Sequence, residues 1–313
     1  MRFLTRAAAL ALACGAVGGA SIAAAGQFSS WGSAAPVDPQ DASGVNTPAQ
    51  DGCPIQSPDG GKLYLASNRP GGAGGLDLWV ASRDDAGDPW GEPVNLSALN
   101  TSADEFCPTP VRGGGLFFVR RPSTCGLGDI YFARRNPKHG WSEPKRLACA
   151  PDGPNSELDE MGPSYFEADG AAQLYFSRSR TLAQGGAVPG DIFASTLGED
   201  GAFGAAAKVD ELSAEMANDI QPNVRKDGRE IVFSSNRTGG AGSQDIWTAV
   251  RKQPGDPWLA AVNVVNSGAP VNTSESETRP SLSWRGETLY FGRAPAAGGP
   301  GDVYWTGREK TTG

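Results

Sequence analysis

The chain has 313 residues, of which 39% are hydrophobic and 20% charged, and its formal net charge is −8. An acidic chain lacks the basic surface that nucleic acids and anionic membranes require, so we exclude both as partners. The 43 glycines and 24 prolines indicate many turns, and apolar residues recur between them in short runs typical of strands. This pattern indicates a folded, loop-rich β protein.

The first 25 residues have the pattern of a secretory signal peptide. Arg2 and Arg6 form a basic start, an Ala/Leu-rich stretch follows, and Ala23-Ala24-Ala25 offers a cleavage site of small residues. Removal of this segment (1–25) changes the net charge to −10, because it takes away two arginines and no acid. We expect the remaining residues, 26–313, to form a single domain, periplasmic or secreted, monomeric, and without a further membrane segment.

Two other interpretations of the N-terminal segment stay open. A membrane-spanning helix fits less well, because the segment is rich in Gly and Ala and no stop-transfer pattern follows it. A lipoprotein signal acylated at Cys14 is the second alternative. It is disfavoured by Ala11, which stands where such signals prefer Leu, and by the apolar residues that follow Cys14.

A sequence unit recurs five times along the chain. Its signature is an Asp followed by an aliphatic and an aromatic residue, at intervals of 52 to 62 residues. The five copies are Asp77-Leu-Trp79, Asp129-Ile-Tyr131, Asp191-Ile-Phe193, Asp245-Ile-Trp247 and Asp302-Val-Tyr304. Repeats slightly above 40–50 residues with several short strands each are typical of a β-propeller. The sequence therefore predicts an all-β, five-bladed β-propeller with four antiparallel strands per blade.

The order of strands in each unit predicts how the ring closes. The innermost strand is expected to begin at Pro54, Pro108, Pro163, Pro222 or Pro280, and the outermost at Trp31, Trp90, Trp141, Phe203 or Trp258. Residues 26–52 thus begin with an outer strand that no blade precedes, whereas the last unit ends without one. We expect the N-terminal strand to complete the last blade, which leaves no free sheet edge.

These repeats resemble those of TolB-like β-propellers. The stretch Ser57-Pro-Asp-Gly-Gly-Lys-Leu-Tyr-Leu-Ala-Ser-Asn-Arg69, the following Gly-Gly-Leu-Asp-Leu-Trp79 and Trp90-Gly-Glu-Pro-Val-Asn-Leu96 carry the resemblance, and it extends over nearly the whole chain after the signal. The resemblance implies an exported bacterial propeller that binds proteins or peptides in the envelope. The best-known member has six blades, so five is a departure from the family.

One position is acidic in all five repeats, three residues before the proline of the innermost strand. The residues are Asp51, Glu105, Glu160, Asp219 and Glu277, and we expect them to ring one mouth of the central channel. Arginines after the second strands, such as Arg121 and Arg180, should reach the same face and pair with them. A feature present in every blade is typical of fold architecture. A net negative mouth would also attract a basic peptide or a divalent cation such as calcium.

The longest interval between signatures suggests a ligand site where the five-fold pattern is broken. Residues 149–160 and 181–190 are insertions that should emerge beside the acidic ring. We predict that this rim binds the ligand, through Asp159, Glu160, Arg178 and Arg180, with the remaining ring acids behind them.

Four cysteines remain after the signal, an even number that favours disulfides in an exported chain. Cys53 and Cys107 occupy the same place, before Pro, in neighbouring repeats, and Cys125 and Cys149 belong to one repeat. Among three possible pairings we prefer Cys53–Cys107 and Cys125–Cys149.

The sequence favours a non-catalytic binding protein over an enzyme. The only histidine, His139, lies in a turn that is expected on the face away from the acidic ring, which disfavours Ser-His-Asp and Cys-His sites. We expect a protein or peptide to bind at the acidic mouth, without a cofactor. The alternative is a carboxylate-based glycoside hydrolase of the five-bladed arabinanase type, since that chemistry needs two suitably spaced acids.

Most tryptophans lie in or beside the expected strands, and Trp284, beside a turn, is the exception.

Overall fold

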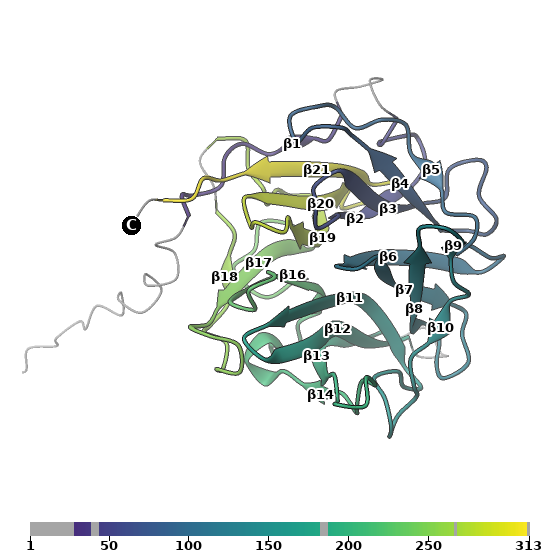
Figure 1. The fold of residues 1–313 in the computed structure, drawn as a ribbon. Coiled ribbons are helices and arrows are strands. Elements are labelled where there is room, and N and C mark those ends of the chain that lie inside the picture. The colour runs from purple at the N-terminus through teal and green to yellow at the C-terminus, as the bar shows by residue number, and fades with distance from the viewer. Residues whose placement is uncertain (1–27, 39–43, 182–186, 266–267, 312–313) are drawn as a thin grey trace, which may run out of the picture.

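The computed structural model describes residues 28–38, 44–181, 187–265 and 268–311. Five antiparallel sheets surround a common centre, as the sequence predicts (Figure 1). Blade 1 contains β2 (Asp51–Gln56), β3 (Lys62–Ser67), β4 (Asp77–Ser82) and β5 (Val94–Asn95). Blade 2 contains β6 (Asp104–Val111), β7 (Gly115–Arg121), β8 (Asp129–Asn136) and β10 (Lys145–Arg146), and β9 (Gly140–Trp141) also pairs with β8.

The other three blades follow the same order from the inside of the ring outwards. Blade 3 contains β11 (Asp159–Ala168), β12 (Ala171–Thr181), β13 (Ala187–Thr196) and β14 (Ala207–Lys208). Blade 4 contains β15 (Ile220–Val224), β16 (Glu230–Ser235), β17 (Asp245–Val250) and β18 (Val262–Asn263). Blade 5 contains β19 (Ser276–Leu282), β20 (Thr288–Ala294), β21 (Asp302–Gly307) and β1 (Ala35–Pro36). A short 3-10 turn, η1 (Asp210–Leu212), follows β14.

The ring closes through the N-terminal strand, as predicted. Ala35 pairs with Trp305 and Pro36 with Tyr304, so β1 forms the outer strand of blade 5. Ser29 continues the contact by donating its backbone N–H to Glu309 O at 2.8 Å. Trp31 is buried beside this strand, with the guanidinium of Arg308 4.1 Å from its ring centroid. Phe28 and Lys310, near the two ends of the described chain, form an isolated bridge.

Three of the signature aspartates, Asp77, Asp129 and Asp245, stabilise the loops that precede the third strands. The Asp77 carboxylate accepts the backbone N–H of Ala73 at 2.7 Å, and Asp245 accepts that of Ala241 at 2.9 Å. Gly72 lies directly against Asp77, and a side chain there would collide with the carboxylate. The glycines of these loops therefore have a structural role, because they let the aspartate come close enough to accept hydrogen bonds from the loop amides.

The first strand of each blade contains a bulge that sequence reasoning missed. The strands begin two to four residues before the prolines, so four of the ring acids lie inside them and the fifth, Asp219, directly precedes β15. At the residue before each proline the backbone is left-handed, with φ between 50° and 60° at Cys53, Cys107, Gly162, Gln221 and Arg279. The extra residue shifts the pairing register and turns these five positions towards the channel.

Both predicted disulfides are present. Cys53–Cys107 joins the first strands of blades 1 and 2, and Cys125–Cys149 ties two connections of blade 2. Two such bonds indicate an oxidising environment outside the cytoplasm. In the described part of the chain, no helix is long and apolar enough to cross a bilayer. The signal peptide expected in residues 1–25, and the alternative acylation at Cys14, lie outside the described residues.

Candidate functional site

The five acids of the ring are fully buried, and each is paired with an arginine of its own blade. The pairs are Asp51–Arg69 at 2.6 Å, Glu105–Arg120 at 2.6 Å, Glu160–Arg178 at 2.8 Å, Asp219–Arg237 at 2.5 Å and Glu277–Arg293 at 2.8 Å. Backbone and hydroxyl donors complete the set. The Glu105 carboxylate, for example, accepts Thr101 N at 2.8 Å and Thr101 Oγ1 at 2.6 Å. The ring therefore ties each hairpin to the preceding loop.

Two neighbouring acids of blade 3, Asp159 and Glu160, have raised pKa values. Asp159 pairs with Arg121 of blade 2, and burial raises the pKa of its carboxyl above the ordinary value against the opposing effect of that arginine. Burial likewise raises the pKa of Glu160, although Ser156 and Arg178 oppose it. Both side chains are almost fully buried, so each has an internal partner and little access to solvent. Their assignment as ligand-binding residues remains a prediction.

The arginines that pair with the ring are not all those expected from the sequence. Arg120 and Arg178 take the places predicted for Arg121 and Arg180. In blade 2 the difference is one residue, which reverses the face of a strand, and in blade 3 the pairing of β12 with β13 shifts register between Arg178 and Arg180. Arg121 instead bridges to Asp159. Arg180 lies in β12, opposite Val188, and its side chain is outside the described part of the structure.

Replacing Glu160 by Ala should lower the free energy of unfolding by about 3 kcal/mol, because it leaves the Arg178 guanidinium and the Ser156 donors without their acceptor. Chemical denaturation of the variant measures the loss. The matched variant is Glu277→Ala, whose residue has the same surroundings in blade 5. Similar losses in both are expected; a neutral Glu160→Ala beside a destabilised Glu277→Ala would show that blade 3 is not held in this way.

The central channel is too narrow for a saccharide or a peptide. Its cavity measures about 30 Å³ and is lined by the left-handed residues and the prolines that follow them. Such a volume admits only ordered water. The Cys53–Cys107 disulfide occupies one side, and Arg279 extends into the channel, where burial and the nearby charge of Arg121 lower the pKa of its guanidinium to about 10. The interior of the channel therefore offers no space for such a ligand.

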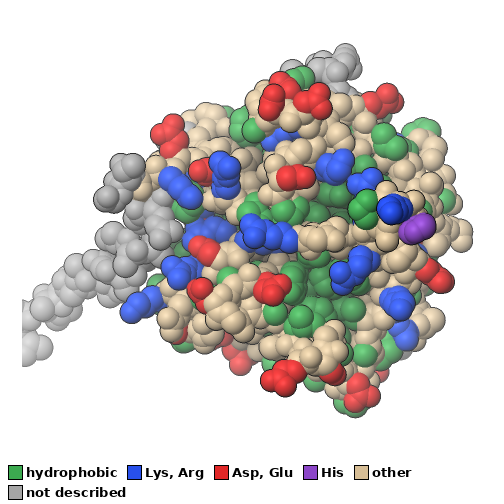
Figure 2. All heavy atoms as spheres, viewed as in Figure 1, with side chains coloured by type: hydrophobic (Ala, Val, Ile, Leu, Met, Phe, Trp, Pro, Cys, Tyr) green, Lys and Arg blue, Asp and Glu red, His purple; other side chains and the backbone are tan. Residues whose placement is uncertain are grey.

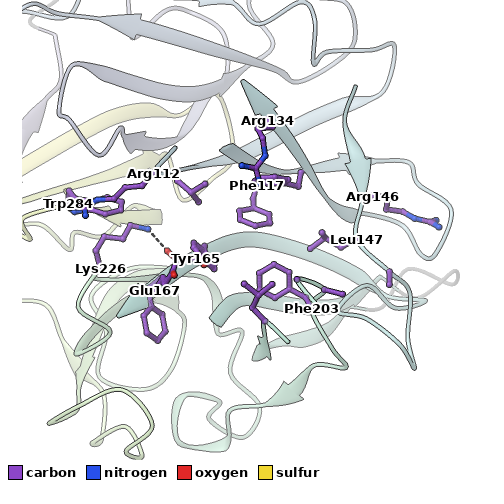
Figure 3. A pocket seen from close by; sticks show the side chains of 17 residues that line it. Arg112, Phe117, Arg134, Arg146, Leu147, Tyr165, Glu167, Phe203, Lys226 and Trp284 are labelled. Atoms are coloured by element: carbon purple, nitrogen blue, oxygen red, sulfur yellow. Dashed lines mark hydrogen bonds between the residues drawn. The ribbon is translucent and has the colours of Figure 1, made fainter. Parts of the chain in front are cut away.

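A larger cavity of about 820 Å³ opens on the opposite face, between blades 2 and 3 (Figure 3). We call it the inter-blade pocket. It is lined by Val111, Arg112, Phe117, Phe132, Arg134, Arg146, Leu147, Ala148, Tyr165, Phe166, Glu167, Leu197, Gly201, Ala202, Phe203, Lys226 and Trp284. Figure 2 shows basic side chains on either side of a hollowed, largely apolar area near the middle of this face.

The pocket exists because blade 3 lacks a contact that fills the same space in other blades. Six residues after the signature Asp, Arg83, Arg251 and Arg308 each lie over the outer-strand tryptophan, 4.0 to 4.1 Å from the ring centroid. Each also donates to a hairpin carbonyl, at 3.1, 2.6 and 2.8 Å. Leu197 is the equivalent residue in blade 3, and Phe203 replaces the tryptophan. A shorter side chain and a smaller ring leave the interface open.

The opposite wall of the pocket has lost the matching group. In blade 3, Tyr175 Oη lies 3.3 Å from Arg251 Nη1 of blade 4. The corresponding residue of blade 2 is Phe117, which has no hydroxyl and faces Leu197 across the pocket. The interface between blades 2 and 3 therefore lacks both the arginine and the tyrosine. Because both are missing, no buried polar group is left without a partner there.

A tyrosine and a carboxylate lie together on the pocket wall. Tyr165 and Glu167 are two residues apart on β11, so their side chains share a face, and Tyr165 Oη donates to Glu167 Oε2 at 3.0 Å. Burial and the adjacent carboxylate raise the pKa of Tyr165 to about 12. Phe117 and Phe203 pack beside the tyrosine, with ring centroids 5.7 and 6.1 Å away. Glu167 is the only carboxylate among the described residues of this pocket.

Hairpin residues of three blades meet at one end of the pocket. Trp284 of blade 5 lies between Arg112 of blade 2, whose guanidinium is 4.7 Å from the ring centroid, and Lys226 of blade 4, whose Nζ is 5.2 Å away. Lys226 Nζ also donates to Tyr165 O at 2.5 Å (Figure 3). The sequence singled out Trp284 as unexplained but gave no reason to place it here.

In the described part of the chain, no group of three or more His, Cys, Asp or Glu side chains is arranged to hold a metal ion. Calcium binding at the acidic mouth therefore remains a prediction.

No protein-family model and no curated protein matches the chain. Several solved structures share its fold. A thermostable family-43 glycoside hydrolase superposes with a TM-score of 0.58 at 16% identity, over 88% of this chain and 92% of that one. An α-L-arabinofuranosidase from Lactobacillus brevis gives 0.57 at 11% identity, over 84% and 91%. The catalytic domain of a GH62 α-L-arabinofuranosidase from Coprinopsis cinerea gives 0.54 at 13% identity, over 92% and 99%.

These comparisons correct two expectations from the sequence. The resemblance to TolB-like propellers is wrong as a guide to relatives, because the similar structures are glycoside hydrolases. The expectation of a non-catalytic protein that binds a protein or peptide is contradicted for the same reason. The short repeat motifs misled because they encode loop geometry, which propellers of different activity can share. At these identities the likeness shows the fold, and the activity must be argued from the site.

Proposed function

We propose that the protein is a glycoside hydrolase that binds its saccharide in the inter-blade pocket. The observation that carries the proposal is the hydrogen-bonded pair of Tyr165 and Glu167 on the wall of a large, aromatic-lined cavity. The similar structures named as glycoside hydrolases support it at the level of the fold. The two disulfides support a location in the periplasm or outside the cell, where the enzyme would meet its substrate.

The chemistry departs from the usual pair of carboxylates, because the described residues of the pocket supply one. Glycosidases commonly use two acids, but a tyrosine nucleophile is a known exception. With a pKa of about 12, the Tyr165 phenol is neutral at ordinary pH and needs a base before it can attack. Glu167, 3.0 Å away, is placed to be that base.

Two steps complete the hydrolysis. In the first, Tyr165 Oη bonds to the anomeric carbon as the glycosidic C–O bond breaks, and Glu167 takes the phenol proton and passes it to the departing oxygen. In the second, a water oxygen bonds to the anomeric carbon as the bond between that carbon and Tyr165 Oη breaks. Glu167 takes one proton from the water and passes it to Tyr165 Oη, and the free sugar leaves. Overall one water is consumed and one glycosidic bond is cleaved.

Closing the pocket should abolish hydrolysis. The double variant Leu197→Arg with Phe117→Tyr restores the arginine and tyrosine that fill the equivalent space between other blades. Incubation with a panel of plant and bacterial polysaccharides, followed by an assay for reducing ends, measures the activity. We expect cleavage by the parent, none by the double variant, and similar melting temperatures, because the introduced pair has its partners.

The control is Glu143→Gln, an exposed carboxylate of blade 2 outside the pocket, which should leave cleavage unchanged. Failure of the parent to cleave any polysaccharide would contradict the proposed function. Full activity in the folded double variant would place the reaction outside the pocket.

A further inference from the structure

The inter-blade pocket carries more positive charge than the described residues around it compensate. Arg112, Arg134 and Lys226 line it and have no carboxylate partner among the described residues, and a fourth cation, Arg146, is 3.7 Å from Asp129. The arginines of the acidic ring, in contrast, all have carboxylate partners. In an acidic protein, unpaired cations gathered around one cavity indicate a negatively charged ligand.

The three cations are positioned by packing on aromatic rings. The guanidinium of Arg112 lies 4.7 Å from the ring centroid of Trp284, and that of Arg134 lies 5.7 Å from the ring centroid of Phe132. Lys226 lies against Trp284 and is fixed by its bond to Tyr165 O. Such contacts hold the charged groups in place while leaving the outer edges of the guanidinium groups free to bind an anion.

A bound anion would stabilise the charged form of Lys226, which its surroundings disfavour. Burial disfavours its charged form and lowers its pKa to about 8, and its one described hydrogen bond goes to a neutral carbonyl. Lys226 is half-buried and has no counter-ion among the described residues, and a carboxylate within reach would favour its charged form.

The pocket has the features of a site for an acidic sugar. The rings of Phe117 and Phe203 and the side chain of Leu147 form an apolar surface between the basic groups. A sugar ring can pack against such a surface while its carboxylate receives paired bonds from a guanidinium. A small inorganic anion would use the charges but leave most of the 820 Å³ without contacts.

We propose that the pocket selects a glycan that carries carboxylate groups, such as one built from uronic acids. This inference rests on the proposed function and names its substrate class. Glu167 and Tyr165 then lie beside Lys226, so that a carboxylated sugar held by the basic groups is next to the hydrogen-bonded pair.

Calorimetric titration of the whole exported chain tests the inference. The probes are trigalacturonic acid, its methyl ester and inorganic phosphate. The ester keeps the sugar rings of the acid, adds one methyl group to each carboxyl and removes its charge, so we expect the acid to bind at least about tenfold more tightly than the ester. Phosphate should neither bind measurably nor displace the acid. Raising the ionic strength should weaken binding of the acid and leave the ester unaffected.

Single substitutions assign the effect to the pocket. Arg112→Gln and Arg134→Gln should each weaken binding of the acid by about tenfold and hardly change binding of the ester. The matched control is Arg285→Gln, an exposed arginine next to Trp284 that does not line the pocket, and it should behave like the parent.

Equal affinity for acid and ester, or unchanged affinity in both pocket variants, would overturn the inference. Displacement of the acid by phosphate would also overturn it, since the site would then recognise charge alone. Failure of the inference can be told apart from failure of the proposed function. Cleavage of neutral polysaccharides without preference for acidic ones rejects the substrate class alone, and tight binding of the acid without cleavage of any glycan rejects the hydrolase alone.

Discussion

Replacing Glu167 by Gln is expected to reduce the rate of polysaccharide cleavage by about 10²–10⁴-fold, because the amide cannot take the proton of Tyr165. Glutamine keeps the shape of the side chain and can still accept a hydrogen bond from the phenol, so binding and melting temperature should stay close to those of the parent. Initial rates of reducing-end release measure the effect.

The variant Tyr165→Phe separates the tyrosine mechanism from other uses of Glu167. Loss of activity in both variants is expected if the phenol oxygen attacks the sugar. Should Tyr165→Phe retain the activity that Glu167→Gln loses, the carboxylate acts without the tyrosine and the two-step scheme is wrong. A Glu167→Gln enzyme as active as the Glu143→Gln control would exclude the pocket carboxylate from the chemistry altogether.

Removing residues 28–37 should strongly destabilise the ring. The deletion exposes the edge of β21, whose pairing with β1 involves Trp305 and Tyr304. It also removes buried Trp31, a loss that by itself costs about 3–5 kcal/mol in protein cores. The open edge offers unpaired backbone groups to other molecules, so we expect a lower melting temperature and aggregation on heating.

A peptide comprising residues 28–37 provides the control for this deletion. Added in excess to the shortened chain, it should raise the melting temperature with a concentration dependence set by its affinity, because it binds only the folded ring. A shortened chain that melts like the parent, or a peptide without effect, would show that β1 contributes little to stability.

Much of the fold could be predicted because each repeat contains the residues that position its own loops. The signature Asp77 is separated by a few residues from the amides that it accepts, so its role is local and visible in the spacing. The ring closure followed from matching pieces at the two ends of the repeat array, and β1 pairs with β21 as expected. Cys53 and Cys107 could be paired because equivalent positions in adjacent blades are neighbours.

The candidate site was harder to predict because its residues come from four blades and are dispersed in the sequence. One signal was present: Leu197 stands where the other four repeats have Arg83, Arg135, Arg251 and Arg308. The two insertions, 149–160 and 181–190, are a more visible break in the five-fold pattern, but they indicate the opposite face. The acidic ring resembles a ligand site in the sequence, because the arginines that pair with its acids can be identified only when the strands are paired.

The closure of the ring also constrains the order of folding. β1 and β21 are the outer and third strands of one blade, yet they lie at opposite ends of the sequence, and their pairing is among the least local contacts of the chain. Contacts of such long range slow folding, because the intervening chain must lose its freedom before they form. Blades 1 to 4 can each assemble from consecutive residues, and the Cys53–Cys107 bond needs only the first two blades. The last blade alone needs residues from both ends of the repeat array, so it can be completed only after the other four blades have their residues in place.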